Sequence, residues 1–394
     1  DPLFFQQTNL LYSRLPNVWS SGINGEGVVV AVVEDAFDME HDDLQDNMLM
    51  TNILDVSSDP HSTYTAGVLG AVGGNGIGII GVSPKVSLVS VSQDLNDDIF
   101  EIENLRIFNN SWGPEDNLGT VDPMSDWDHN IIKKSVTEYD SMWVIANGNG
   151  GESEELSNYD GYANSIYTLA VQSINALGNE LNYAENGANI VGSFYADIMA
   201  YDYSETGVVT TALDNDYVDD FMGTSAAAPM ASGIVSLMLE NNPDINWRDV
   251  INIFSHVGIN NDMFDDGWIK NMAGIDYNHT YGFGAILADL AVAAAADAQY
   301  IISGMEMQKT TSMDPISIDQ AYSYNPTSDL IVEFVTVTLS IPNADDQENL
   351  NIQLKHADGD LFSVSQLAAP HELYLGRLDY HEWPFNSVVH WGER

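Results

Sequence analysis

A serine lies in a run of small residues near the middle of the chain, residues 223–231 (GTSAAAPMA). The run opens an apolar stretch that ends near Leu239 and that we expect to be a helix. Small residues let a peptide backbone approach closely, and the free N–H groups at a helix start favour developing negative charge. Ser225 is therefore a candidate nucleophile with an electrostatic stabiliser beside it. A small-residue helix packed tightly against a sheet would have the same composition.

Two further segments supply partners that a serine nucleophile needs, namely a base and a carboxylate that orients it. His61 precedes an apolar, Gly-rich run and is a candidate base. Residues 28–33 (VVVAVV) are typical of a buried parallel strand, and this run ends at Glu34 and Asp35. Ligands bind beyond the carboxyl ends of strands in open α/β sheets, so these carboxylates lie where a site is expected.

A donor for an oxyanion is the remaining requirement, and a second strand pattern offers one. Residues 143–146 (WVIA) predict a buried strand that runs into residues 147–151 (NGNGG). A side-chain amide on a tight turn at this place can point at an oxyanion. A turn without any function would have the same sequence.

Taken together, in the chain order acid, His, Asn and Ser, these segments resemble the subtilisin superfamily, and within it the kexin/furin branch of proprotein convertases. The likeness covers nearly the whole chain. It also includes residues 1–4 (DPLF), 110–116 (NSWGPED), 160–167 (DGYANSIY), 246–249 (NWRD) and 281–284 (YGFG). The resemblance implies a calcium-dependent serine endopeptidase that cleaves after basic residues, preferably at dibasic Lys-Arg or Arg-Arg sites.

The catalytic roles carried over by this resemblance fall on four residues. Ser225 would be the nucleophile, His61 the general base and then the general acid, and Asn149 the oxyanion donor beside the Ser225 N–H. Glu34 stands where the family has its catalytic Asp, and Asp35 where the family has a second acidic residue. A badly oriented histidine costs a triad about 10⁴-fold in turnover. A pseudoprotease that binds basic peptides without efficient cleavage is therefore an alternative.

Acidic residues that would line the substrate groove carry the implied specificity. By resemblance, Asp116 and Asp160 would hold the residue before the scissile bond, and Asp35 the one before it. Asp122 and Glu103 would add affinity for a basic residue further upstream. A guanidinium or ammonium group is expensive to desolvate unless carboxylates meet it, which explains a preference for Arg or Lys. Solvated surface charges are the alternative in so acidic a chain.

The substrate backbone would pair with Ser111, Trp112 and Gly113, an extended edge that binds peptides by strand addition. A general subtilisin-like protease of broad specificity is a second alternative. The acidic pair implied for the basic-residue pocket argues against it.

Calcium is the implied metal, because hard cations take oxygen ligands from carboxylates, amides and backbone carbonyls. By resemblance, one site combines early acidic residues with a Gly-rich loop. Its ligands would be the side chains of Asp1, Asp43 and Asn75 and the carbonyls of Val72, Ile77 and Ile79. A second site would use Asp116, Glu155 and Glu185, where the alternative is a cluster of like charges without an ion, which is costly to bury.

Composition favours cationic partners. The chain has 59 acidic and 11 basic residues, a formal net charge of −48. This argues against nucleic acid and anionic membranes, whereas basic peptides or proproteins and divalent cations would gather at its surface. An inhibitory prosegment or a chaperone is a further possible partner. The chain's only adjacent basic pair is Lys133-Lys134, and a dibasic-cleaving protease gains from having few such sites in itself.

Three features of the sequence bear on the compartment of the protein. There is no cysteine, so a disulfide framework is excluded. No apolar run is long enough to span a bilayer. The chain begins at Asp1, where a matured member of the family would begin, and we expect a processed product that is secreted, periplasmic or in the lumen of the secretory pathway.

The patterns divide the chain into two expected domains. Residues 1–300 alternate apolar strands with helical stretches, which predicts an α/β catalytic domain with a mostly parallel sheet flanked by helices. Residues 301–394 contain alternating patterns at 330–339 and 350–354 and resemble the all-β, jelly-roll-like P domain of convertases. That domain is expected to be incomplete at its C-terminus, so its missing strands are either truncated or supplied by another chain.

Overall fold

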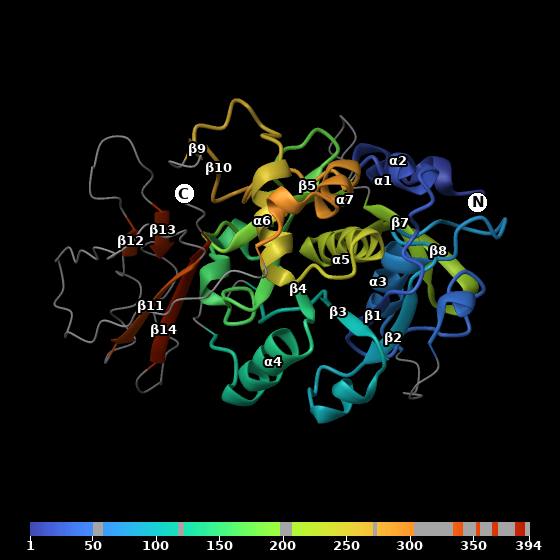
Figure 1. Ribbon diagram of the computed structural model, residues 1–394, viewed down its shortest axis with the longest axis horizontal. Coiled ribbons are helices and arrows are strands. Elements are labelled where there is room, and N and C mark those ends of the chain that lie inside the picture. The colour runs from blue at the N-terminus through green and yellow to red at the C-terminus, as the bar shows by residue number, and fades with distance from the viewer. Residues whose placement is uncertain are drawn as a thin grey trace.

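A parallel sheet forms the centre of the molecule. The computed structural model describes residues 1–49, 58–116, 122–197, 207–270 and 274–302, and strand backbone at 334–341, 352–354, 365–368 and 383–390. The sheet has six strands in the order β2-β1-β3-β4-β5-β6 (Figure 1). These strands are β1 (Val29–Val33), β2 (Ser87–Val91), β3 (Leu105–Asn110), β4 (Met142–Ala146), β5 (Thr168–Asn175) and β6 (Ile190–Asp197). All of their pairings are parallel, and the strands predicted over 28–33 and 143–146 are confirmed as β1 and β4.

Helices cover both faces of this sheet, which confirms the predicted α/β architecture. The α-helices are α1 (Thr8–Tyr12), α2 (Leu15–Ser20), α3 (His61–Gly70), α4 (Asp126–Glu138), α5 (Thr224–Asn241), α6 (Trp247–Val257) and α7 (Ala288–Ala295). Short 3-10 turns are η1 (Phe4–Gln6), η2 (Gln45–Asn47), η3 (Asp97–Glu101), η4 (Gly151–Ser153), η5 (Ser157–Tyr159), η6 (Leu213–Asn215) and η7 (Ala298–Tyr300). In Figure 1, α5 and α4 lie on opposite sides of the sheet.

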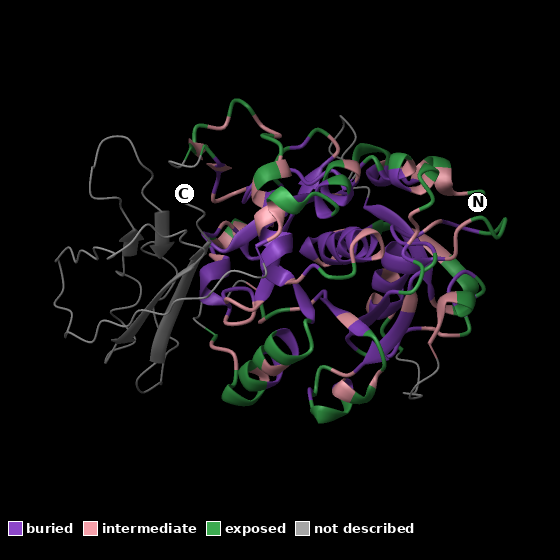
Figure 2. Ribbon diagram, viewed as in Figure 1, coloured by how far each residue is buried: buried purple, intermediate pink, exposed green. Residues whose placement is uncertain are grey.

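The central helix α5 is buried along most of its length, as its purple ribbon in Figure 2 shows. Every residue from Thr224 to Leu239 is buried except Ser225, which is partly exposed. Its alanines let the helix lie close to the strands, and its first turn emerges beside the carboxyl ends of β3 and β4. The tight packing of a small-residue helix and an accessible serine at its start therefore coexist in the same element.

Antiparallel pairs complete the described structure. β7 (Val208–Ala212) pairs with β8 (Asp216–Phe221), and β9 (Ile269–Lys270) pairs with β10 (Asp276–Tyr277). Later in the chain, β11 (Phe334–Ile341) pairs with β14 (Trp383–His390), and β12 (Ile352–Leu354) with β13 (Ser365–Ala368). Strands therefore occur at both places where alternation predicts them. The boundary near residue 300 and the completeness of the C-terminal domain stay predictions, because most of 303–394 lies outside the described residues.

Within the described ranges, no helix combines the length and the hydropathy needed to cross a bilayer.

Gly67 lets α3 contact β7 closely, and a mutation there tests this packing. A Cβ atom at Gly67 would lie 2.2 Å from Thr211 Oγ1 and 2.7 Å from the Thr211 backbone nitrogen. Because the strand backbone cannot move aside cheaply, Gly67→Ala is expected to lower the free energy of unfolding by about 1–3 kcal/mol. Denaturant titration measures this loss. Asn130→Ala on the exposed side of α4 is the control, and an equal effect of both changes would contradict the close contact.

Candidate active site

A carboxylate and an imidazole meet where β1 ends and α3 begins. Glu34 directly follows β1, and its side chain is 5% exposed. Glu34 Oε2 lies 2.7 Å from Nδ1 of His61, the first residue of α3. A carboxylate only accepts hydrogen bonds, so the proton of this bond is on Nδ1 and Nε2 is the nitrogen left for proton transfer. The longer side chain of Glu thus reaches the histidine.

The surroundings of His61 have opposing effects on its pKa. Burial lowers the pKa of His61, whereas the hydrogen bond and the charge of Glu34, together with the charge of Asp59, raise it. The net direction is upward from the ordinary value of 6.5. Phe221 places its ring edge-to-face against the imidazole, with 5.5 Å between the centroids. The His61 ring therefore contacts both the Glu34 carboxylate and the Phe221 ring.

Ser225 lies in the first turn of α5, where N–H groups without helical partners favour an anion. Its hydroxyl donates a hydrogen bond to the Ser111 carbonyl, with 3.0 Å between the oxygens. Among the described residues, no hydrogen bond links Ser225 to the His61 ring. The structure therefore shows this serine bonded to the end of the β3 segment, with the histidine bonded to Glu34.

Asn149 is fixed beside Ser225 through the residue that precedes the serine. Its Oδ1 accepts from the Thr224 N–H at 2.9 Å and from the Thr224 hydroxyl at 3.1 Å. Because both Thr224 donors bind the amide oxygen of Asn149, the amide nitrogen is the end of this side chain that does not contact Thr224. Gly223 is required here, since its φ is +90° and a Cβ on it would lie 3.2 Å from the same Oδ1.

The acidic residues assigned to the substrate groove are only partly brought together. Asp160 is buried and accepts the Tyr162 N–H at 2.7 Å. Burial, reinforced by the charges of Asp122 and Asp116, raises the pKa of Asp160 to about 7, although backbone hydrogen bonds oppose this. Burial also raises the pKa of Asp122, whose backbone bridges to that of Asp160. These three acids therefore form one group.

The two other predicted acids, Asp35 and Glu103, are exposed. Asp35 is exposed next to Glu34. Glu103 is exposed in the turn before β3, and no interaction described in this structure joins it to Asp122.

The expected substrate edge follows β3. Trp112 donates its indole N–H to the Val33 carbonyl at 2.6 Å, which ties this edge to the strand that carries Glu34. Its ring meets the Tyr162 ring at 5.0 Å between centroids, nearly at right angles. Ser111 is buried, whereas Gly113 is exposed, and a Cβ on Gly113 would lie 3.5 Å from Asp160 Oδ2.

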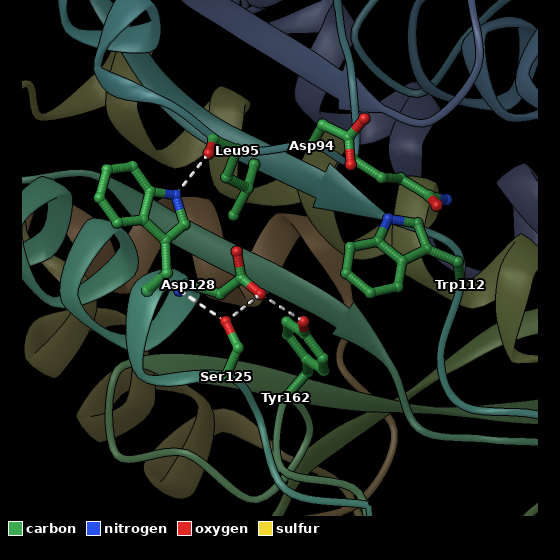
Figure 3. A pocket seen from close by; sticks show the side chains of 8 residues that line it. Asp94, Leu95, Trp112, Ser125, Asp128 and Tyr162 are labelled. Carbon is green, nitrogen blue, oxygen red and sulfur yellow. Dashed lines mark hydrogen bonds between the residues drawn. The ribbon is translucent and has the colours of Figure 1, made fainter.

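A pocket of about 490 Å³ lies beside Trp112 (Figure 3). Asp128 lies on one wall, where its Oδ2 accepts the Ser125 hydroxyl at 2.7 Å and the Tyr162 hydroxyl at 2.8 Å. Trp127 donates its indole N–H to the Leu95 carbonyl at 2.7 Å. The lining residues are Gln93, Asp94, Leu95, Trp112, Ser125, Trp127, Asp128 and Tyr162.

Sequence reasoning missed Asp94 and Asp128. The available signal was the start of α4, because Ser125 caps this helix by accepting the Asp128 N–H, a pattern readable from Ser and Asp three residues apart. That pattern predicts the helix start but not the pocket, since the other wall comes from residues 93–95 after β2.

Three carboxylates form a candidate metal centre next to the acidic group. Asp116, Glu155 and Glu185 each offer an oxygen, and these oxygens lie within 4.8 Å of one another. Burial, with the charges of Glu155, Asp116 and Asp160, raises the pKa of Glu185 well above its ordinary value.

Glycines make room for these carboxylates. A Cβ on Gly150 would lie 1.7 Å from Glu155 Oε2, and one on Gly148 would lie 2.3 Å from Glu185 Oε1. The backbone thus closes around three converging acids, which fits a hard divalent cation with oxygen ligands.

The Gly-rich loop at 72–79 surrounds a second set of oxygens. Both oxygens of Asp1 accept backbone N–H groups, from Gly74 at 2.8 Å and Gly76 at 3.0 Å. The fully buried Asp43 contacts the Asn75 side-chain amide at 2.7 Å and accepts the Ile79 N–H at 2.8 Å. The predicted side chains therefore gather at this loop, with Asp1 fastening the start of the chain to it.

The carbonyls expected to complete that site are available. In the described part of the chain, no hydrogen bond uses the carbonyl oxygens of Val72, Ile77 or Ile79. Free carbonyls beside the buried Asp43 carboxylate and the exposed Asn75 amide are a donor set that suits a hard cation.

Comparisons with known proteins agree with this architecture. The Subtilase family of peptidases matches residues 25–284. Protease KEX1 of Kluyveromyces lactis is 31% identical over the whole chain, which covers 56% of that protein. Furin-1 of Xenopus laevis is 32% identical over 75% of the chain, or 41% of that protein.

A solved structure shares the fold. The crystal structure of the serine protease of Aeromonas sobria has a TM-score of 0.82 at 22% identity and covers the whole chain and 86% of its own. The same protease has been solved in complex with a chaperone, at a TM-score of 0.76.

The parallel sheet and the residues gathered at its carboxyl edge thus define a subtilisin-like α/β peptidase scaffold. The chain belongs to the subtilase family, and the curated relatives most similar to it include proprotein-convertase-type proteases. It spans about half the length of the first of these relatives.

The hydrogen bond between Glu34 and His61 predicts how the imidazole titrates. In Glu34→Gln the charge is lost, so the pKa of His61 is expected to fall, since burial then acts with less opposition. Histidine NMR titration in a Ser225→Ala background measures this without catalysis. Because the folded pKa is raised, His61 contributes stability below pH 6.5 that is lost as pH rises through the folded value, and this dependence should weaken in the variant. An unchanged pKa would contradict the pairing.

Proposed function

We propose that this chain is a calcium-dependent serine endopeptidase of the proprotein convertase type, which cleaves peptide bonds after basic residues and prefers dibasic sites. The observation that carries the proposal is the 2.7 Å contact between Glu34 and His61, at the same edge of the sheet as Ser225. Family membership and the relatives described above support the reaction class.

In the proposed mechanism, His61 Nε2 removes the proton of the Ser225 hydroxyl as its oxygen attacks the scissile carbonyl. Glu34 holds the imidazole by Nδ1 and stabilises the imidazolium that forms. The oxyanion is met by the Ser225 N–H and by the amide nitrogen of Asn149, whose other end is bonded to Thr224. His61 then protonates the leaving amine, and water releases the acyl group through the same histidine.

The Ser111 carbonyl has two possible partners in this scheme. It accepts the Ser225 hydroxyl at 3.0 Å, yet it is also part of the edge proposed to bind the substrate backbone. A substrate N–H that takes this carbonyl would release the hydroxyl toward His61. Substrate binding and alignment of the nucleophile would therefore be coupled.

Specificity is proposed to come from the acidic group. Asp160 and Asp116 would receive the basic side chain before the scissile bond, and a bound cation would lower the raised pKa of Asp160 and keep its charge. Asp35 would contact the second basic residue. Asp122 and Glu103 would add affinity for a basic residue further upstream, and the pocket with Asp94 and Asp128 offers further carboxylates and indole faces for such a side chain.

Calcium is proposed at both sets of oxygens. Asp116, Glu155 and Glu185 would hold one ion beside the basic-residue pocket. Asp43, Asn75 and the free loop carbonyls would hold the other, with Asp1 closing the loop. Bound there, the ions would supply positive charge that offsets the clustered carboxylates.

Partners and compartment follow from the same reading. Basic peptides or proproteins would be the substrates, and a prosegment or chaperone a further partner, in line with the chaperone complex of the Aeromonas protease. A secreted, periplasmic or secretory-pathway location fits such substrates.

A pseudoprotease that binds basic peptides is the second candidate. The observation that favours it is the bond of the Ser225 hydroxyl to Ser111 instead of His61.

Fluorogenic peptides ending in Lys-Arg and in Ala-Phe separate these candidates. With calcium, release after Lys-Arg is expected to exceed release after Ala-Phe, and Ser225→Ala should reduce it by about 10⁴-fold or more. Asp160→Asn should lower the preference for Lys-Arg by about tenfold to a hundredfold, since a charge-assisted contact is lost. Asp126→Asn, an exposed acid at the start of α4, should change little.

The Glu34→Asp variant separates an active protease from the pseudoprotease. Because an aspartate falls short of His61 by one methylene, turnover should fall in this variant. Peptide affinity without turnover in the native chain, with activity gained in Glu34→Asp, would instead establish the pseudoprotease.

Thermal unfolding tests the calcium centre. Calcium at a hundred times its Kd is expected to raise Tm by roughly 5–10 °C, and Glu155→Gln should reduce this rise. With chelator the same variant should be the more stable protein, because one of three converging like charges is gone. Glu154→Gln, the exposed neighbour, should keep the native response. An equal response of both variants to calcium would contradict the assignment.

A further inference from the structure

The chain's only adjacent pair of basic residues, Lys133-Lys134, lies inside a helix. Eleven Lys and Arg residues are spread over the sequence, and no other two are neighbours. The pair falls in the last two turns of α4 (Asp126–Glu138), with Lys133 exposed and Lys134 partly exposed. It is therefore the one dibasic segment of this sequence that an enzyme of the proposed specificity would recognise.

The residue after the pair is held firmly in the native fold. Ser135 is 1% exposed, and its hydroxyl donates to the Ile132 carbonyl at 2.8 Å and accepts the Trp143 indole N–H at 2.6 Å. Its own carbonyl accepts the N–H groups of Tyr139 at 3.2 Å and Ser141 at 3.0 Å. The bond between Lys134 and Ser135 is therefore fixed on its C-terminal side by core contacts.

The lysine side of the bond is also engaged. Lys134 Nζ lies 2.9 Å from Asp97 Oδ1 and 4.1 Å from the centroid of the Phe100 ring. Phe100 in turn stacks on Tyr139 at 4.5 Å between centroids. These contacts hold the side chain that the acidic pocket would need, so a second molecule cannot take Lys134 from the closed helix.

The closed helix and a bound substrate differ in backbone conformation. A peptide bound by strand addition is extended, at about 3.3 Å per residue, whereas an α-helix rises about 1.5 Å per residue. Local opening of α4 is needed before the pair can enter a groove. The helix can open without the whole sheet, because only Ile131, Ile132, Ser135 and Val136 of its residues are buried.

We propose that the Lys134–Ser135 bond is a cryptic self-cleavage site, exposed when α4 opens; this rests on the proposed dibasic specificity. In the step, Ser225 of one molecule attacks the Lys134 carbonyl of another and forms an acyl-enzyme. The Ser135 amino group leaves with a proton from His61. Water then hydrolyses the ester, giving a carboxylate on Lys134 and free Ser225.

The cut would fall between two parts of the site. Trp127 and Asp128, on the pocket wall, lie on its N-terminal side, whereas β4 leads to Asn149 on its C-terminal side. Cleavage inside α4 would also remove the helical hydrogen bonds across the cut. Loss of local stability in α4 would thus become irreversible inactivation.

Helix propensity at an exposed position provides a matched pair of variants. Asn130 is exposed on α4 and lies outside the catalytic and binding residues. Asn130→Gly and Asn130→Ala are each made in the Ser225→Ala background and used as substrates for the native enzyme. Since glycine favours helix opening over alanine, fragments 1–134 and 135–394 should appear about fivefold faster from the Gly variant. Mass spectrometry identifies the new ends.

A Ser225→Ala, Lys134→Gln substrate should resist cleavage at this bond even though it loses the contact with Asp97. A Lys-Arg fluorogenic peptide in the same tube reports the activity of the native enzyme. Peptide cleavage without the 134/135 cut, or equal rates for the Gly and Ala substrates, would overturn the self-cleavage site alone. A peptide left intact would overturn the proposed specificity and this inference with it.

Discussion

The hydrogen bond from His61 to Glu34 is the interaction on which the proposed chemistry depends, because it compensates a buried negative charge. Only one oxygen of this carboxylate, Oε2, is bonded to the ring, and in the described part of the chain the buried Oε1 has no partner. A buried carboxylate is expensive unless it is paired, so the imidazole supplies most of the compensation. The same contact joins the end of β1 to the start of α3 and sets which nitrogen of His61 carries the proton. The same hydrogen bond therefore stabilises the fold at this place and orients His61 in the proposed mechanism.

Acidic side chains impose a second constraint at the same edge of the sheet. Asp160 and Glu185 are both buried, and desolvation raises the pKa of each. In such surroundings a cation lowers the cost of the charge, whether it is a metal ion or the guanidinium of a bound peptide. A chain with a net charge of −48 offers few cations of its own. In the proposed function, positive charge from outside the chain would complete the site.

Sequence patterns were sufficient where one element decides the outcome. The apolar run at 28–33 and the small-residue run that opens α5 predicted β1 and the placement of Ser225, since buried parallel strands and close-packed helices need those residues. Contacts between separate elements were not predictable in this way. The pocket joins residues 93–95 to the start of α4, because the path of the loop after β2 decides which residues face that helix. The bond of the Ser225 hydroxyl to Ser111 is a rotamer choice that no pattern encodes.

Glu34 reaches His61 from a strand end whose backbone is held by hydrogen bonds. The backbone at this point cannot shift freely, since the Glu34 N–H donates to the Val91 carbonyl at 3.0 Å and the Val33 carbonyl accepts the Trp112 indole at 2.6 Å. With the strand end pinned on both sides, the extra methylene is accommodated by the side chain and by where α3 begins. The result is the 2.7 Å contact between Glu34 Oε2 and His61 Nδ1. We therefore expect that a change in the length of the acid alone, or in where α3 begins, would weaken this contact.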